Sequence, residues 1–235
     1  MALNTMLKIP AKYKPISGLS TWVQGIFLIS GILSVVSFFS EYLQSQLINK
    51  ALNGGLVTLS EAQANDNREA LIGYIHTAFL IIGIVIFLMW VYRANKNLHS
   101  FVNPVLKFTP GWAVGWFFVP FASLVQPYRA VSEISKASDP NIDPALNSVD
   151  KLPASAIVSL WWALFLLSNF VSQIAFRLVL HNDTATELLT ATYAYMVSDV
   201  IDIIGIIITI VMVKRISQAQ DLRYNKINTV TIQEV

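Results

Sequence analysis

The sequence contains no cysteine and few charged residues. The absence of cysteine excludes disulfides, thiolate metal sites and cysteine nucleophiles. Charged residues make up 13% of the 235 residues, whereas a soluble domain usually has about 25%. Hydrophobic residues make up 54%, and the mean hydropathy is +0.56. This composition indicates an integral membrane protein, and the net charge of only +2 gives no reason to expect a nucleic-acid partner.

The sequence also lacks the short motifs of common enzyme classes. It has no GxSxG, no HExxH, no Walker loop and no dinucleotide-binding glycine pattern. The histidines His99 and His181 are expected on opposite sides of the membrane, so the three histidines cannot share a metal ion. We therefore expect a protein that is not an enzyme, with no catalytic residues, no cofactor and no metal site.

Four apolar runs are long enough to cross a membrane as helices, because a hydrocarbon core of about 30 Å needs about 20 residues. These runs cover roughly residues 19–40, 71–92, 156–180 and 190–213. The first run is longer than the core of a cleaved signal peptide, so we expect it to be a retained signal anchor behind Lys8, Lys12 and Lys14. The prediction is an all-α integral membrane protein, with one membrane domain over 1–235 and a polar tail over 214–235.

A fifth apolar stretch, residues 111–125, is too short to span. As a helix it would measure about 22 Å at 1.5 Å per residue. Pro120 removes a backbone donor within it, and Pro127 ends it. Trp112 and Trp116 lie one turn apart, and tryptophan favours the headgroup boundary of a membrane. We expect a short interfacial or re-entrant helix between the second and third spans; the sequence leaves these two alternatives open.

The distribution of lysine and arginine predicts the orientation. If 111–125 does not cross, 13 of the 16 cationic residues lie on the side of both termini. If it crosses, the split becomes 7 against 9 and the bias disappears. Cytoplasmic loops carry the excess of positive residues. We therefore expect a multi-pass membrane protein with both termini in the cytoplasm.

Residues 128–138 are expected to form an amphipathic helix at the cytoplasmic surface. Arg129 and Glu133 are spaced i, i+4, and Lys136 follows three residues later, so local ion pairs are available. A solvated helix face is the simpler interpretation of these charges. The candidate interfacial platform comprises Trp112, Trp116, Pro120, Pro127, Tyr128, Arg129 and Glu133.

The same region resembles a family of bacterial multi-span membrane proteins known as a domain of unknown function. The resemblance rests on the run Pro110, Gly111, Trp112, Ala113, Val114, Gly115, Trp116, then Pro120, Pro127, Tyr128 and Glu133, with Arg93, Asn97, Trp161, Trp162 and Asn169 around it. It covers about residues 70–220, and residues 44–70 have no match. It implies several membrane helices, and it brings no established activity and no catalytic residues.

Polar residues within the last two spans predict a polar seam. An ionisable group inside a span costs about 2.5 to 3.5 kcal/mol on insertion scales, so each is a functional candidate. Asp199 and Asp202 lie about 60° apart on one helix face. Asn169, Gln173 and Arg177 form a stripe at steps of four on the preceding span, an expected antiparallel neighbour. The seam acts either as packing contacts or as a water-lined pathway or ligand site.

Two functions follow from these patterns. The absence of catalytic motifs and the aromatic platform favour a non-enzymatic scaffold or regulatory partner. The alternative is a small oligomeric channel or transporter that uses the Asp199 and Asp202 seam. An enzyme acting on lipid has the least support. The expected partners are the lipid bilayer and either a second copy of the chain or another membrane protein.

Overall fold

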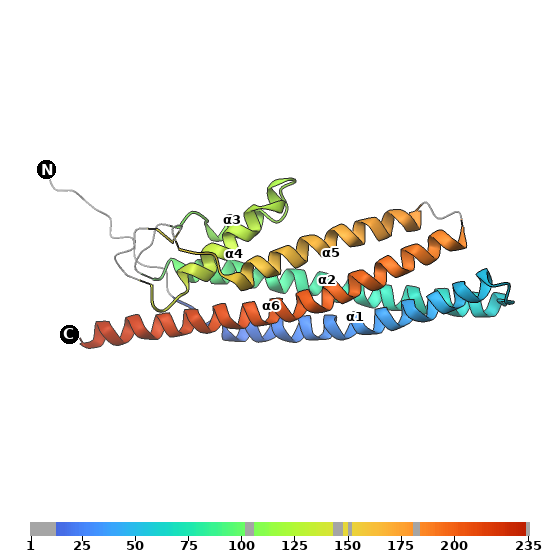
Figure 1. Ribbon diagram of the computed structural model, residues 1–235. Helices are drawn as coiled ribbons and strands as arrows, with labels where there is room; N and C mark the ends of the chain where they lie inside the picture. The colour runs from blue at the N-terminus through green and yellow to red at the C-terminus, as the bar shows by residue number, and fades with distance from the viewer. Residues whose placement is uncertain (1–12, 102–105, 143–147, 150–151, 181–183, 234–235) are drawn as a thin grey trace. The chain divides into compact units, whose positions relative to one another are not determined.

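The computed structural model describes residues 13–101, 106–142, 148–149, 152–180 and 184–233, and these residues contain helices and no strand. Lys8, Lys12 and His181, which entered the sequence predictions, lie outside the described residues. Four helices are long and apolar enough to cross a membrane: α1 (Ser17–Leu52), α2 (Leu59–Leu98), α5 (Ala156–Leu180) and α6 (Ala185–Gln233) (Figure 1). The predicted all-α membrane fold with four spans is confirmed.

Matching hydrogen-bonded caps begin α2 and α6. Thr58 Oγ1 accepts a bond from the backbone N–H of Glu61 at 3.2 Å, and Glu61 Oε2 accepts one from the backbone N–H of Thr58 at 2.8 Å. Thr184 and Glu187 repeat the arrangement at 3.3 and 3.1 Å. This reciprocal pairing satisfies backbone donors that a helix start leaves without an intrahelical partner.

The chain forms two compact units. Unit 1 comprises Met1–Thr21, Phe87–Val158 and Val213–Val235, and unit 2 comprises Trp22–Ile86 and Ser159–Met212. Unit 2 therefore holds most of the apolar length of the four long helices. Unit 1 holds the short elements and the polar continuation of α6.

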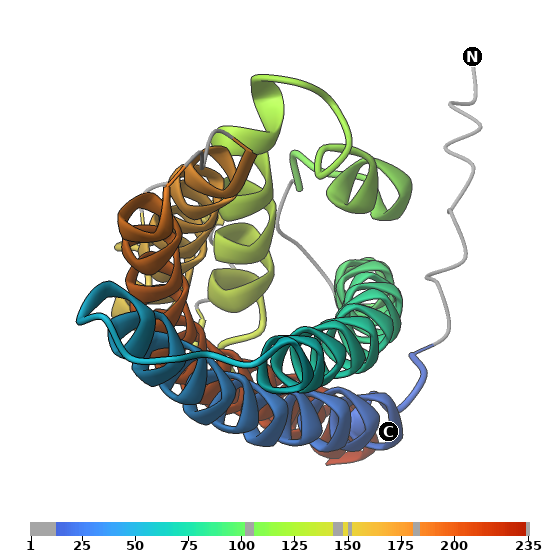
Figure 2. The ribbon, with the colours of Figure 1, turned by 90° about the vertical axis from the view of Figure 1, so that its right-hand side faces the viewer.

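Within unit 2, α1 packs against both α2 and α6, and α6 packs against α5. Ser40 of α1 donates a hydrogen bond to Glu69 of α2 at 2.6 Å. A Cβ added to Gly31 of α1 would lie 3.4 Å from Ile206 of α6, so α1 and α6 approach closely there. Figure 2 shows α1 beside both neighbours. In Figure 1 the last turns of α1 and α5 and the first turns of α2 and α6 lie at the same end of unit 2, as antiparallel spans require.

Between α2 and α5, unit 1 contains α3 (Pro110–Gly115), the 3₁₀-helix η1 (Ala122–Leu124) and α4 (Gln126–Ala137). The expected short helix is present, but it stops at Gly115 and does not continue to residue 125. Phe121, directly after Pro120, has φ 61° and ψ −43°, and the N–H of Ala122 bonds the carbonyl of Pro120 at 2.7 Å. This is a γ-turn of the rare, strained kind, and it lies between the turns that follow α3 and the start of η1.

The core of unit 1 is a hydrogen-bonded polar network around Gln220 of α6. Gln220 Nε2 donates to the carbonyl of Ala94 at 2.9 Å and to Ser138 Oγ at 3.0 Å. Its Oε1 accepts from Asn97 Nδ2 at 3.2 Å. Trp90 Nε1 donates to Ser217 Oγ at 3.0 Å one turn earlier along α6. Because buried polar groups are costly without partners, these bonds fix the packing of α2, α4 and α6 in unit 1.

Candidate functional site

Four acidic side chains of unit 2 form a carboxyl cluster: Glu41 on α1, Glu69 on α2, and Asp199 and Asp202 on α6. Glu41 is 9% exposed and Asp199 is 6% exposed. Glu41 Oε2 and Asp199 Oδ2 are buried and have no hydrogen-bond partner among the residues that the structure describes. A buried polar atom without a partner costs free energy, so these two oxygens mark a site where the protein gives up stability.

The members of the carboxyl cluster follow one another in space. Glu41 is within electrostatic range of both Glu69 and Asp199. Asp199 is within range of Asp202 and is hydrogen-bonded to Ser37 of α1. Asp202 is in turn within range of His76 on α2. The result is a line of ionisable side chains carried by three helices.

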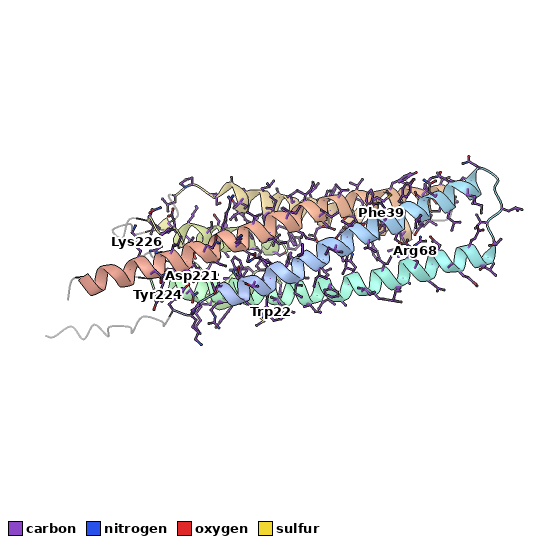
Figure 3. All side chains as sticks on the ribbon, turned by 90° about the horizontal axis from the view of Figure 1, so that it is seen from below. Trp22, Phe39, Arg68, Asp221, Tyr224 and Lys226 are labelled. Carbon is purple, nitrogen blue, oxygen red and sulfur yellow. The ribbon has the colours of Figure 1, made fainter. Side chains whose placement is uncertain are left out.

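Arg68 and Ser40 hold one end of this line. Arg68 Nη2 lies 3.2 Å from Glu69 Oε1 and donates to Asn65 Oδ1 at 2.6 Å. Its Nε donates to Ser40 Oγ at 2.8 Å, and Ser40 donates to Glu69. Figure 3 labels Arg68 on α2, beside the part of α1 that carries Phe39. The guanidinium therefore balances Glu69, while Glu41 and Asp199 lie further along.

On α5, the face toward α6 differs from the predicted one. Ser168 donates a hydrogen bond to Asp202 Oδ1, and Ser172 Oγ lies 2.7 Å from Ser198 Oγ. Asn169, Gln173 and Arg177 are exposed. The Asn169 side chain donates to the carbonyl of Phe165 in its own helix at 2.7 Å.

The predicted seam therefore needs a correction on α5. Asp199 and Asp202 lie together, but Asn169, Gln173 and Arg177 do not face them. The stripe that does so begins one residue earlier, at Ser168. A Cβ added to Gly205 of α6 would lie 3.8 Å from Leu164 Cβ of α5. Short serine side chains fit this close approach, whereas longer amides face outward.

Sequence analysis missed Glu41 and Glu69. The predicted spans of about 19–40 and 71–92 leave Glu41 and Glu69 just outside their ends, so neither was a candidate intramembrane residue. The structure instead extends α1 to Leu52 and begins α2 at Leu59. One signal was present: Glu41 stands four residues after Ser37, which places both on one helix face.

The interfacial platform divides into an exposed part and a buried part. Trp112 is exposed, and its ring centroid lies 4.8 Å from that of Trp116. Pro120 is exposed in the turn before η1, Pro127 is buried in the first turn of α4, and Tyr128 is half-buried.

Two charged residues of α4 complete the platform. Arg129 is exposed, but Glu133 is 5% exposed and accepts bonds from the backbone N–H groups of Lys107 at 2.7 Å and Phe108 at 3.2 Å. Glu133 is therefore not part of a solvated helix face. It fixes the segment before α3 to α4.

Within the part of the chain that the structure describes, no group of three or more His, Asp or Glu side chains is placed to hold a metal ion. The carboxyl, imidazole and hydroxyl groups along the line are each able to gain or release a proton.

The fold and the cluster define an all-helical membrane protein with four candidate spans and ionisable groups between them. The chain belongs to the family described as "Domain of unknown function (DUF4328)", which matches residues 53–218. The match begins at residue 53, so part of the segment 44–70 that the resemblance left out belongs to it. No curated protein and no solved structure matches the chain.

Proposed function

We propose that the chain is a small proton channel or proton-coupled transporter, active as an oligomer, that binds protons at the carboxyl cluster. The observation that carries this proposal is the pair of buried carboxyl oxygens without partners, Glu41 Oε2 and Asp199 Oδ2. A structural role would be better served by carboxyls with all their hydrogen bonds made. The two oxygens stand where a proton can be gained and released.

The surroundings of the two oxygens favour protons over other cargo. Ionisable groups inside a membrane span are costly and mark proton relays or ion pathways. His76, Ser37 and Ser168 lie next to the aspartates and carry exchangeable protons. The proposal needs no cofactor and no catalytic step.

The line of carboxyls reaches only part of the way along unit 2. Beyond Asp202, the next buried hydroxyls on the facing helices bond to their own helix: Ser34 to the carbonyl of Ser30 at 3.2 Å, and Thr209 to that of Gly205 at 2.7 Å. This supports a path that is open to protons at the Glu69 end and closed at the other. Complete transfer then requires a second arrangement of the helices or a second copy of the chain.

We further propose that the chain lies in the bacterial inner membrane, with both termini in the cytoplasm and the Glu69 end outside. The excess of lysine and arginine on the side of the termini supports this orientation. In this orientation, protons enter the carboxyl cluster from outside the cell.

The test is proton flux into liposomes that contain the purified chain, read with an internal pH-sensitive dye. Wild type is expected to dissipate an imposed pH gradient, and Asp199→Asn and Glu41→Gln are expected to abolish this flux. Asp66→Asn, which neutralises an exposed carboxylate on α2, is the matched control and retains it. Wild-type flux equal to that of empty liposomes would refute the proposal.

A scaffold or regulatory partner is the second candidate. Its support is the exposed aromatic surface of unit 1, where Trp112 and Phe118 face outward. This candidate expects a stable oligomer or partner complex and no flux. Recovery of the chain only as a lone monomer in mild detergent would count against it.

A further inference from the structure

Unit 1 contains a cavity of about 450 Å³ between α4 and the segment before α3. Ligand pockets commonly have volumes of about 300 to 1,000 Å³, so the cavity can hold a small molecule or a lipid headgroup. Its polar lining includes Lys107, Gln126, Tyr128, Arg129, Ser132 and Lys136. We call it the cationic cavity. It lies in unit 1 and has no part in the proton path proposed for unit 2.

Among the lining residues that the structure describes, positive side chains outnumber negative ones. It includes three cationic side chains, those of Lys107, Arg129 and Lys136, and one acidic side chain, that of Glu133. The Glu133 carboxylate is engaged by the backbone N–H groups of Lys107 and Phe108. It thereby holds Lys107 against α4 and fixes the wall of the cavity. The excess positive charge favours an anionic ligand.

The donors in the lining suit a phosphate group. Arg129 presents a planar guanidinium that can bond two phosphate oxygens at once, and lysine ammonium groups bind phosphate as point charges. Arg129 and Lys136 lie on one helix, seven residues and thus about two turns apart. Gln126, Tyr128 and Ser132 add neutral polar groups for the rest of a headgroup.

The chain that leads into α4 exposes a set of large apolar side chains. Phe118 is 70% exposed, Phe121 is 87% exposed and Leu124 is 54% exposed. The strained γ-turn at Phe121 lies within this segment, directly before η1. Exposed apolar groups next to cationic ones are typical of protein segments that enter the interface of an anionic membrane.

We infer that the cationic cavity binds the phosphate group of an anionic phospholipid, while Phe118, Phe121 and Leu124 enter the same leaflet. Lys107, Arg129 and Lys136 contact the phosphate. The apolar segment supplies the contact with the acyl chains. A soluble phosphate ester has the same headgroup chemistry but lacks acyl chains, so the two sources are separable.

The test uses the full chain, purified in a neutral detergent and titrated with phosphatidylglycerol, phosphatidylcholine or soluble glycerol phosphate. Bound lipid is counted by native mass spectrometry. Wild type is expected to retain phosphatidylglycerol in preference to phosphatidylcholine. The double variant Arg129→Gln, Lys136→Gln is expected to bind phosphatidylglycerol about ten-fold more weakly, because charge-assisted hydrogen bonds are lost.

The matched control is the double variant Lys214→Gln, Arg215→Gln, which removes two exposed cations of α6 that do not line the cavity. It is expected to bind phosphatidylglycerol like wild type. An equal loss in both double variants would overturn the site, as would the absence of any preference over phosphatidylcholine. Glycerol phosphate binding as tightly as phosphatidylglycerol would overturn the lipid source. An unchanged unfolding temperature shows that each variant is folded.

Discussion

The hydroxyl of Ser168 on α5 donates a hydrogen bond to Oδ1 of Asp202 on α6. Asp199, about one turn earlier on the same face of α6, instead has a buried Oδ2 without a partner. The two aspartates therefore have different environments. Both aspartates bond to a neighbouring helix, Asp202 to Ser168 of α5 and Asp199 to Ser37 of α1, but Asp199 also has a buried oxygen that is available to a proton.

The first prediction concerns this contact between α5 and α6. Ser168→Ala is expected to lower the free energy of unfolding by about 1 to 3 kcal/mol, because it leaves a half-buried carboxyl oxygen without its donor. Asp202→Asn keeps an oxygen that can accept from Ser168, so a smaller loss is expected. Thermal unfolding in detergent measures both. Asn169→Ala, on the exposed face of α5, is the control, and a loss equal to that of Ser168→Ala would contradict the assignment of the packed face.

The second prediction uses the absence of native cysteine, because a thiol reagent can then label only the cysteine that each variant introduces. Asp199→Cys is expected to react in intact cells with a membrane-impermeant thiol reagent, because the cluster opens toward the Glu69 end. Asn169→Cys and Gln173→Cys are expected to react less, since they are exposed on α5 and would face lipid. Ser123→Cys, predicted on the cytoplasmic side, is expected to stay unlabelled from outside.

Leu56→Cys serves as the positive control for this labelling, because Leu56 is 90% exposed between α1 and α2. Labelling at position 56 without labelling at position 199 would mean that water does not reach the carboxyl cluster. Labelling at 123 from outside would instead overturn the proposed orientation.

The apolar runs were sufficient to predict the four long helices, since hydrocarbon thickness sets a length that few other structures need. Trp112 and Trp116 were also correctly placed side by side, because helical spacing determines this locally. The packed face of α5 was not predictable in the same way. Ser168 and Ser172 have short side chains of intermediate hydropathy, and Asn169 and Gln173 are the more conspicuous polar residues. Only the close approach of α5 and α6 selects the serines.

The positions at which the helices end were the second feature that the sequence did not predict. Apolar runs show where a helix is in lipid, but they do not show where it ends, because a helix continues in water when capping and packing support it. Glu41 and Glu69 belong to such continuations. The polar tail after residue 213 also remains helical through unit 1, where Gln220 makes contacts that no local pattern could indicate.

The third prediction concerns Gln220. Gln220→Leu nearly preserves volume but removes the partners of the Ala94 carbonyl, Ser138 and Asn97, so a loss of about 2 kcal/mol or more is expected. Gln218→Leu makes the same chemical change at an exposed position of the same helix. Its effect is expected within about 0.5 kcal/mol of zero. Comparable losses in the two variants, measured by chemical unfolding in detergent, would contradict the network.

The fourth prediction concerns the alkaline stability of unit 1. The Tyr13 hydroxyl donates to Asp221 Oδ1 at 2.5 Å, and the Tyr13 ring stacks on that of Tyr224 at 4.2 Å. Figure 3 labels Asp221 and Tyr224 close together on α6. Burial, followed by the hydrogen bond to Asp221, raises the pKa of Tyr13 above its usual value. Folding therefore favours the neutral phenol.

The sign of the pH effect follows from that shift. A pKa that is raised in the folded state contributes stability that is fully present below the unfolded value of about 10 and is lost as the pH rises beyond it. The unfolding free energy of wild type is therefore expected to fall above about pH 10, and that of Tyr13→Phe is expected to fall less steeply. Unfolding in detergent between pH 7 and pH 11 measures the difference, with Tyr74→Phe, at an exposed tyrosine, as the control. Parallel curves for wild type and Tyr13→Phe would show that the contact between Tyr13 and Asp221 does not hold the phenol neutral.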